Sequence, residues 1–414
     1  MTAALLAAAD PLLAGDVDLT VVAIVIGKVA AAFVFLLVSV LLMIWFERKV
    51  ISDMQNRIGP NRAGPFGILQ TLADGIKLFF KEDLLPDQAD KPVFRLAPYV
   101  ATVPAFLTFT IVPVAGVFED GRQGVASIAG RDTFLQVVDP PVGILFLLAM
   151  SSISVYGVML AGWASGSKYP LLGSVRATAQ MVSYEAALGL SVVAVVLVAG
   201  SLSTHDIVLQ QGTAPWEWNL VTLGFVPFVI FLVAATAELN RPPFDLVEAE
   251  QELVGGFHTE YSSVRFALFF LAEFMNTITM SAIIVTLFLG GPRGPLLFGP
   301  DWIWPPVWFF AKLLAFLFVF VWFRGTLPRF RYDQLMDLGW KRLIPLALGW
   351  LLVLGAIRIA DDEGWNRPLV FVISFTGLVV AGALLLGAIR VADHGRAARG
   401  ESEESGVGER EGVG

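Results

Sequence analysis

Long apolar stretches separated by short polar loops run along almost the whole chain. A helix needs about 20 mainly apolar residues to cross the hydrocarbon core of a bilayer. The pattern predicts nine such spans, at 20–46, 96–118, 141–163, 177–200, 220–238, 264–290, 303–323, 342–359 and 368–390. Hydrophobic residues make up 56% of the 414 residues and charged residues only 15%, whereas a soluble protein carries roughly 25% charged residues. The sequence therefore predicts an all-α polytopic membrane protein.

The loop between the first two predicted spans has a pattern of its own. It begins with a run rich in turn-forming residues, "RIGPNRAGPFG", and continues with "PFGILQTLADGIKLFFKED". Turn formers fix the path of the backbone, and the second run repeats apolar residues at helical spacing on one face. We expect an amphipathic helix lying in the membrane interface. Packing of this helix on a partner subunit is an equal alternative, and both can hold.

Lysine and arginine positions predict the orientation, because cytoplasmic loops are enriched in them. Most basic residues fall in the first loop, the seventh-to-eighth loop and the C-terminal tail, whereas the opposite loops hold Arg122, Arg131, Arg293, Arg358 and Arg367. This bias places the N-terminus outside and the C-terminus in the cytoplasm. The predicted organisation is a short outer N-terminus at 1–19, eight helices at 20–360, an additional helix at 368–390, and a disordered cytoplasmic tail at 391–414.

The residue types exclude several kinds of site. The chain has no cysteine, which excludes disulfides and cysteine-ligated zinc or iron–sulfur centres within it. Its three histidines, His205, His258 and His394, are far apart in the sequence, and no metal site is predicted. No phosphate-binding glycine motif follows a strand-like segment, and no basic stripe suggests nucleic acid.

Carboxylates are concentrated in one loop, "AELNRPPFDLVEAEQELVGGFHTEY" at 237–261, which lies between two apolar spans. Two more, Glu185 and Glu273, lie inside predicted spans, about 12–14 Å from the cytoplasmic surface at 1.5 Å per residue. Ionisable residues at such depth usually mark a pathway, although a buried helix–helix hydrogen bond is the alternative. Tyr184 offers Glu185 a neighbouring hydroxyl. Lys28 and Lys312 also lie within spans, and for both a structural role is a strong alternative.

Four segments carry a resemblance to a known family. These are "ERKVISDMQNRIGPNRAGPFG" (47–67), "SKYPLLGSVRATAQMVSYE" (167–185), "AELNRPPFDLVEAEQELVGGFHTEYS" (237–262) and "RGTLPRFRYDQLMDLGWK" (324–341). They are similar to the signatures of one membrane-subunit family of respiratory complex I, the proton-pumping NADH:quinone oxidoreductase. The family comprises the H subunits of the bacterial complex and their mitochondrial equivalent, subunit 1. The resemblance extends over about residues 20–360.

The resemblance implies a translocase subunit in the bacterial plasma membrane that joins the hydrophilic arm to the proton-pumping membrane arm. Quinone would be the substrate, while NADH, FMN and the iron–sulfur clusters would belong to partner subunits. By motif, the quinone channel would be lined by Glu47, Arg48, Arg57, Pro60, Arg62, Phe66, Phe244 and Phe257. A buried proton path coupled to quinone reduction would use Glu185, Glu238, Asp245, Glu248, Glu250, Glu260 and Glu273.

One feature departs from the family, whose members usually end after the eighth span. The segment "NRPLVFVISFTGLVVAGALLLGAIR" predicts a ninth, which the resemblance does not explain. Two other functions are weighed against the complex I subunit. The first is the related subunit of a membrane-bound hydrogenase or ferredoxin-linked complex. The second is a stand-alone ion transporter, which internal repeats would favour, and the sequence has no matching halves.

Overall fold

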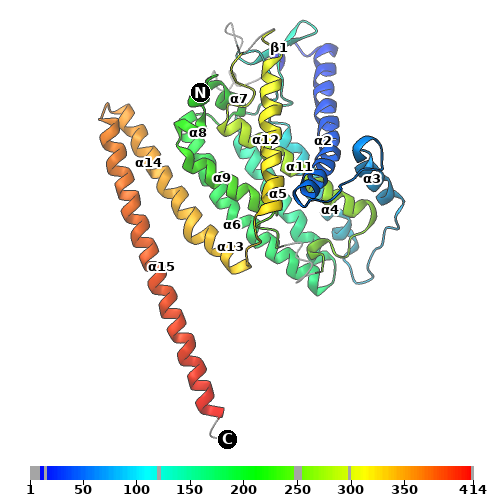
Figure 1. The fold of residues 1–414 in the computed structure, drawn as a ribbon. Coiled ribbons are helices and arrows are strands. Elements are labelled where there is room, and N and C mark those ends of the chain that lie inside the picture. Colours follow the sequence, from blue (N-terminus) through cyan, green and yellow to red (C-terminus); the bar gives the residue numbers. More distant parts are fainter. Residues whose placement is uncertain (1–9, 14–15, 119–122, 247–253, 297–299, 412–414) are drawn as a thin grey trace. The chain divides into compact units, whose positions relative to one another are not determined.

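The computed structural model describes residues 10–13, 16–118, 123–246, 254–296 and 300–411 (Figure 1). The chain divides into two compact units, Met1–Ala347 and Leu348–Gly414, and each is described by itself. The first unit contains the helices that carry the candidate site.

Helices dominate the described residues, as the sequence predicts. Eight of these helices are long and apolar enough to cross a membrane: Leu19–Met54 (α2), Lys91–Phe109 (α4), Gly143–Ala164 (α5), Lys168–Ala199 (α6), Ser263–Phe288 (α11), Trp304–Thr326 (α12), Tyr332–Asp362 and Arg367–Ile389. The seventh comprises α13 (Tyr332–Leu338), a π-helical turn (Gly339–Leu343) and α14 (Ile344–Asp362). The all-α polytopic class is confirmed.

The predicted span at 220–238 corresponds to a shorter apolar helix, α9 (Phe225–Glu238), of 14 residues. It is preceded by Gly224, whose φ of 76° separates it from the short helix α8 (Asn219–Thr222). At 1.5 Å per residue α9 is about 21 Å long, less than the roughly 30 Å of a hydrocarbon core. The number of membrane crossings therefore stays a prediction.

Helix α2 is much longer than its predicted span. The side chain of Asp18 caps it by accepting a hydrogen bond from the backbone N–H of Leu19 at 2.7 Å. Its 36 residues correspond to about 54 Å, so the helix extends well beyond a hydrocarbon core of roughly 30 Å. The last turns of α2, which carry Glu47 and Arg48, therefore exceed the length that a crossing requires.

The second predicted span ends early. Helix α4 stops at Phe109, and residues 110–118, expected to be helical, instead approach a β-hairpin made of β1 (Val125–Ile128) and β2 (Arg131–Phe134). The backbone N–H of Val114 donates to the carbonyl of Leu135 at 3.1 Å. Pro113 has no N–H to continue the helix, and pairing with the hairpin satisfies the backbone groups beyond it.

Small residues allow the central helices of the first unit to approach closely. Ala97 and Ala101 of α4 and Ala161 and Ala164 of α5 belong to one buried cluster. A Cβ added to Gly157 of α5 would lie 2.6 Å from the backbone nitrogen of Ala101. Close packing through small residues is the usual way in which membrane helices associate, and here it forms the scaffold next to which α6, α9 and α11 pack.

The first loop contains a turn at Pro65–Gly67 (η2) and the helix α3 (Gln70–Phe80), which lies beside the lower part of α2 in Figure 1. Arg48 of α2 forms an ion pair of 2.6 Å with Asp74 of α3, and the indole N–H of Trp45 donates to the carbonyl of Phe66 at 3.0 Å. Apolar side chains of α3 stay exposed, among them Phe79 and Phe80. This exposure is compatible with an interfacial helix, which remains a prediction.

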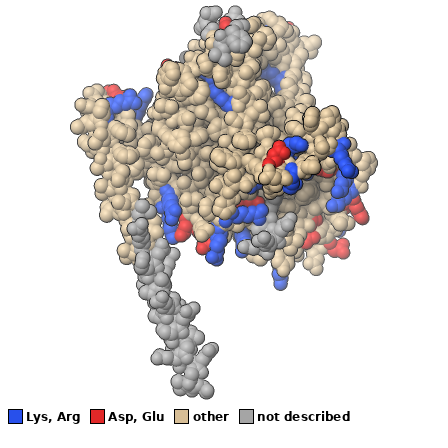
Figure 2. Space-filling model, in the orientation of Figure 1, with Lys and Arg blue, Asp and Glu red and all other residues tan. Residues whose placement is uncertain are grey.

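On the face shown in Figure 2, charged side chains of the first unit gather toward its lower edge and below α3, and a broad belt of uncharged residues lies above them. Such a belt is the surface expected where lipid surrounds a protein.

The second unit contains most of α14 and the helix α15 (Arg367–Glu411). Trp350 and Phe375 meet edge to face with ring centroids 6.3 Å apart, so the two helices pack on each other as a hairpin. The helix α15 continues to Glu411. The disordered tail expected at 391–414 stays a prediction, because an isolated helix rich in Gly and Glu is marginal in water.

Candidate functional site

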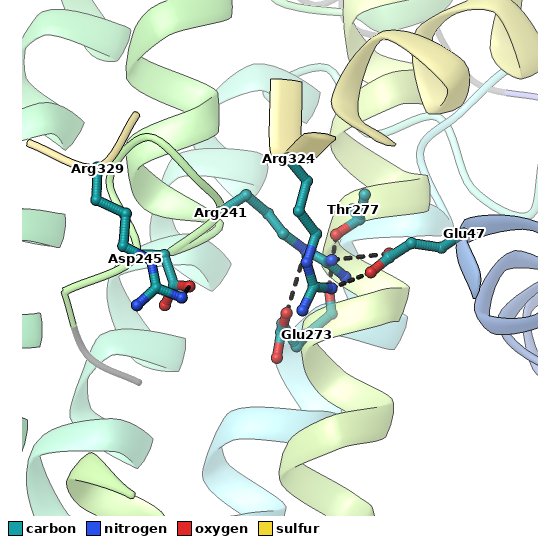
Figure 3. Close-up of polar contacts among 7 residues, drawn as sticks. All are labelled: Glu47, Arg241, Asp245, Glu273, Thr277, Arg324 and Arg329. Atoms are coloured by element: carbon teal, nitrogen blue, oxygen red, sulfur yellow. Dashed lines mark hydrogen bonds and ion pairs between the residues drawn. The ribbon is translucent and has the colours of Figure 1, made fainter. Parts of the chain in front are cut away.

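Arg241 lies at the centre of the candidate site. It follows α9 in the loop that the sequence marks as acid-rich, and it is only 3% exposed. Its Nη1 lies 2.8 Å from Oε2 of Glu47 on α2, and its Nε lies 3.1 Å from Oε1 of Glu273 on α11 (Figure 3). One guanidinium therefore joins carboxylates from two helices that are far apart in the sequence.

Two further arginines, from the segment around the end of α12, complete this charge cluster. Arg324 pairs with the second carboxylate oxygen of Glu47, and Arg329 pairs with Asp245 at 3.0 Å beside it (Figure 3). The guanidinium of Arg241 also stacks over the ring of Phe274, with 4.5 Å between its carbon and the ring centroid. Buried charges need such partners, because an unpaired charge in a low-dielectric interior costs several kcal/mol.

The loop that carries Arg241 and Asp245 is fixed by Gln180 of α6. The amide nitrogen of Gln180 donates to the carbonyls of Ala237 at 2.7 Å and Phe244 at 3.0 Å, and it reaches the side chain of Asn240 at 3.1 Å. These contacts hold the loop against α6, so the position of Arg241 is set by backbone hydrogen bonds as well as by charge.

A cleft opens beside the charge cluster on the side of the first loop; we call it the loop cleft. It has a volume of about 720 Å³ and is lined by Ile44, Glu47, Arg48, Ile51, Arg57, Ile58, Gly59, Pro60, Gln70, Asp74, Phe270, Phe274 and Arg324. Four residues predicted for the quinone channel, Glu47, Arg48, Arg57 and Pro60, thus line one cleft. Its wall combines apolar side chains with arginines.

A second, smaller cavity lies on the other side of the cluster; we call it the inner cavity. It has a volume of about 70 Å³ and is lined by Ala101, Ser154, Val158, Met181, Glu238, Leu239, Asn240, Phe257, His258, Phe266, Phe269, Phe270, Ala272, Glu273 and Asn276. Phe270 lines both this cavity and the loop cleft. A polar cavity of this size has room for several water molecules.

Two successive serines of α5 hold the deeper carboxylates. Ser151 donates to Glu238 and Ser152 donates to Glu185 of α6. Glu238, 8% exposed, also lines a smaller cavity of about 20 Å³ that lies next to Ser151, Asn276 and Thr279. The hydroxyl of Tyr184, expected beside Glu185, instead donates to the carbonyl of Leu335 at 2.9 Å, because successive helix residues point in different directions.

The remaining predicted residues lie around these hollows. Phe257 lines the inner cavity, whereas Phe244 is buried between the rings of Tyr184 and Phe330. Arg62 and Phe66 are exposed on the first loop, and Glu260 is partly buried before α11. Glu248 and Glu250 lie outside the described residues. The functional roles of all these side chains stay predictions.

The two lysines within spans have structural partners. Lys28 forms a 2.8 Å ion pair with Asp10 near the hairpin. The ammonium of Lys312 donates to three backbone carbonyls around the end of α11, those of Leu289 at 2.6 Å, Gly291 at 3.1 Å and Arg293 at 2.6 Å. A cation at a helix C-terminus offsets the unpaired carbonyls there, so the structural alternative accounts for both residues.

Sequence reasoning missed several polar side chains of the site: Ser151, Ser152, Gln180, Asn276 and Arg324. Arg324 and Gln180 lie within the quoted family segments, so their motifs could have drawn attention to them. Serines are common in membrane helices, and nothing in the sequence alone aligns Ser151 and Ser152 with carboxylates on other helices.

Comparison with known proteins gives a consistent result. Residues 27–355 match the family described as NADH dehydrogenase. The chain is 52% identical over 371 residues to the H subunit of NADH-quinone oxidoreductase from Frankia casuarinae, covering 88% of this chain and 79% of that protein. It is 53% identical over 348 residues to the protein of the same name from Frankia alni, covering 83% of this chain and 75% of that protein.

Proposed function

This chain belongs to the NADH dehydrogenase family, as a membrane subunit of NADH-quinone oxidoreductase, and we propose that it admits the quinone through the loop cleft and couples its reduction to proton movement through buried carboxylates. Its partners are the other subunits of that complex. Membership of this family favours a complex I subunit over the subunit of a membrane hydrogenase and over a stand-alone transporter.

The composition of the loop cleft supports its role as the quinone route. Its volume of about 720 Å³ falls within the roughly 300–1,000 Å³ typical of small-molecule sites. Arg48 and Arg57 supply hydrogen-bond donors for the carbonyl oxygens of a quinone headgroup, which only accept. The side chains of Ile51, Ile58 and Phe274 supply the apolar wall that a hydrocarbon tail requires.

The observation that carries the proposal is the position of Arg241 between the two hollows. Glu47 lines the loop cleft and Glu273 lines the inner cavity, and Arg241 pairs with both. Reduction of a quinone to a quinol takes up two electrons and two protons, and the cleft is more negative after the electrons arrive and until the protons follow. A change of charge beside Glu47 alters how strongly Arg241 holds Glu273, because coupled sites titrate together.

From Glu273 the proposed proton path continues through the inner cavity to Glu238, and then along α5 to Glu185. Ser151 and Ser152 hold the two deeper carboxylates, and a hydroxyl can donate to an ionised carboxylate or accept from a protonated one. Asp245, Glu248, Glu250 and Glu260 are proposed to join this path on the loop side. Quinone is the substrate, and NADH, FMN and iron–sulfur clusters are bound by partner subunits.

The chain is a multi-pass membrane protein, and we place it in the bacterial plasma membrane with its N-terminus outside. This orientation follows from the lysine and arginine bias. It puts the loop cleft and the charge cluster on the cytoplasmic side, where electrons from the hydrophilic arm would arrive.

The proposal is tested with the assembled complex in membrane vesicles. Glu238→Gln keeps the hydrogen bond with Ser151 but cannot release a proton, so proton pumping should fall roughly tenfold or more. Arg57→Gln should raise the apparent KM for a short-chain quinone by about five- to tenfold, since it removes a charged donor. NADH oxidation by an artificial acceptor, which takes electrons before the quinone, should be unchanged in both.

Two matched controls change equivalent side chains elsewhere. Glu363→Gln alters an exposed glutamate between α14 and α15, and Arg131→Gln alters a partly exposed arginine of the hairpin; both should behave like the wild type. Normal pumping by an assembled Glu238→Gln complex would contradict the proton path. An unchanged quinone KM in Arg57→Gln would contradict the assignment of the loop cleft.

A further inference from the structure

His258 lies in a wall shared by two hollows. It lines the inner cavity together with Glu238 and Glu273, and it also lines an open groove of about 300 Å³, which we call the side groove. The side groove is bounded by the end of α3 and the segment before α11, including Leu78, Lys81, Gly255, Thr259, Ser262 and Phe266. Among the residues that the structure describes, His258 is the titratable side chain common to both hollows.

The orientation of the imidazole is restricted by its neighbours. The ring meets Phe257 edge to face at 5.0 Å and Phe266 at 5.3 Å between centroids. It sits at the end of a single 3₁₀ turn, Gly256–His258 (η4). The backbone N–H of Tyr261 donates to the carbonyl of His258 at 3.0 Å. The imidazole is thus held between two phenylalanine rings.

Proton access to the inner cavity from the loop cleft is obstructed by Arg241. A guanidinium keeps its proton at any physiological pH, so Arg241, which lies between Glu47 and Glu273, cannot itself relay one. The carboxylates behind it therefore need a separate connection to water. The side groove shares His258 and Phe266 with the wall of the inner cavity, and Arg241 lines neither of these two hollows.

We propose that His258 is the relay of a second proton route, which leads from the side groove into the inner cavity and is separate from the cleft that admits the quinone. This inference rests on the proposed function of the carboxylate path.

The chemistry of a neutral imidazole suits this position. Burial lowers the pKa of His258 from 6.5 to about 4, so the ring is neutral near pH 7, with one nitrogen that accepts and one that donates. The accepting nitrogen takes a proton from the side of the groove, and the other nitrogen releases its proton toward the cavity. One proton is transferred, the ring is neutral before and after, and rotation or tautomer exchange restores the starting form.

The test compares substitutions at His258 in the assembled complex reconstituted into liposomes. His258→Phe keeps an aromatic ring in the wall but removes both nitrogens. We expect normal oxidation of NADH by an artificial acceptor, a roughly tenfold fall in proton pumping and a larger solvent isotope effect in D₂O. Leu78→Ala, which changes a non-titratable residue of α3 that lines the side groove, should pump at nearly the wild-type rate.

Chemical rescue separates a relay from a packing role. In His258→Ala, imidazole added on the side of the groove should restore at least about half of the pumping rate, since a free imidazole can occupy the vacated space and transfer protons. Pyrrole has the same shape but no accepting nitrogen, and it should not restore pumping. Wild-type pumping by His258→Phe, or equal effects of imidazole and pyrrole, would overturn the relay; if His258→Phe does not assemble, the rescue of His258→Ala decides.

Glu238→Gln is measured in parallel, so that the two proposals can fail separately. Normal pumping by Glu238→Gln would contradict the proposed carboxylate path itself. Loss of pumping in Glu238→Gln together with normal pumping in His258→Phe would contradict only the proposed role of His258 as a relay.

Discussion

At the scale of single residues, the site depends on how one buried arginine pairs with two acids, the buried Glu47 and the partly buried Glu273. Arg241 pairs with Glu47 through Nη1 and with Glu273 through Nε, which uses the planar fork of a guanidinium in two directions. A lysine ammonium is a compact point charge without this fork. The arrangement is therefore specific to arginine, even though the charge is the same.

Replacing Arg241 with methionine removes the cation between two carboxylates: Glu47 keeps its ion pair with Arg324, whereas Glu273 loses its ion pair with Arg241. Removal of one partner from a buried ion pair typically costs about 3–5 kcal/mol, so we expect the amount of assembled complex to fall severely. The amount is measured from native gels together with NADH oxidation by an artificial acceptor. The double variant Arg241→Met with Glu273→Gln should recover part of the loss, since it removes the negative charge that the single variant leaves without this arginine. Assembly of the single variant at the wild-type level would mean that these pairs contribute little.

The candidate residues differ in how far the sequence could predict them. Glu185 and Glu273 are conspicuous because carboxylates are rare within apolar spans. The residues that hold these carboxylates cannot be predicted in the same way. The contact of Ser152 with Glu185 depends on how α5 and α6 are rotated relative to each other, and hydropathy carries no information about rotation. Similarly, the pairing of Glu47 with Arg324 joins two helix ends separated by 277 positions.

At the scale of elements, the spans are predictable and their ends are not. Hydropathy continues beyond Phe109, so the second predicted span runs to residue 118. The backbone instead leaves the helix and pairs near Leu135, a tertiary contact that local sequence does not encode. The long α2 shows the opposite error, because its last turns are polar and remain helical beyond the apolar stretch.

The contact between α4 and α5 makes a prediction about helix packing. In Gly157→Leu, the new side chain collides with Ala101, since even a Cβ there would lie 2.6 Å from a backbone nitrogen. Overpacking of this kind typically costs about 1–3 kcal/mol or more, and the melting temperature of the purified complex should fall. Gly189→Leu on α6 is the matched control, because no atom lies within 4 Å of its added Cβ. Equal melting temperatures for the two variants would argue against a tight α4–α5 contact.

At the scale of the whole molecule, the additional helix α15 decides the side of the membrane on which the chain ends. Nine crossings from an outer N-terminus end in the cytoplasm, whereas eight end outside. The count depends on the 14-residue α9, whose buried side chains are covered by protein, so it does not need the full length of a lipid-exposed span.

A topology reporter measures this outcome directly. We expect a reporter fused after Gly414 to behave as cytoplasmic, because nine crossings lead there. A second reporter inserted at the turn after Glu363, between α14 and α15, should behave as external and serves as the control. Strong external activity from the fusion after Gly414 would mean that one of the nine helices does not cross.

Glu47 and Glu273 compete for the same guanidinium, that of Arg241. A proton added to Glu47 releases part of the guanidinium to Glu273, and a proton added to Glu273 releases it to Glu47. Thermodynamic linkage requires the two effects to be equal in free energy. If a charge in the loop cleft changes the free energy of proton binding in the inner cavity, a proton in the inner cavity must therefore change the free energy of binding that charge in the cleft by the same amount. Under the proposed coupling, the same bridge through Arg241 would make the reaction reversible, so that a sufficient proton gradient would drive electrons out of the quinol.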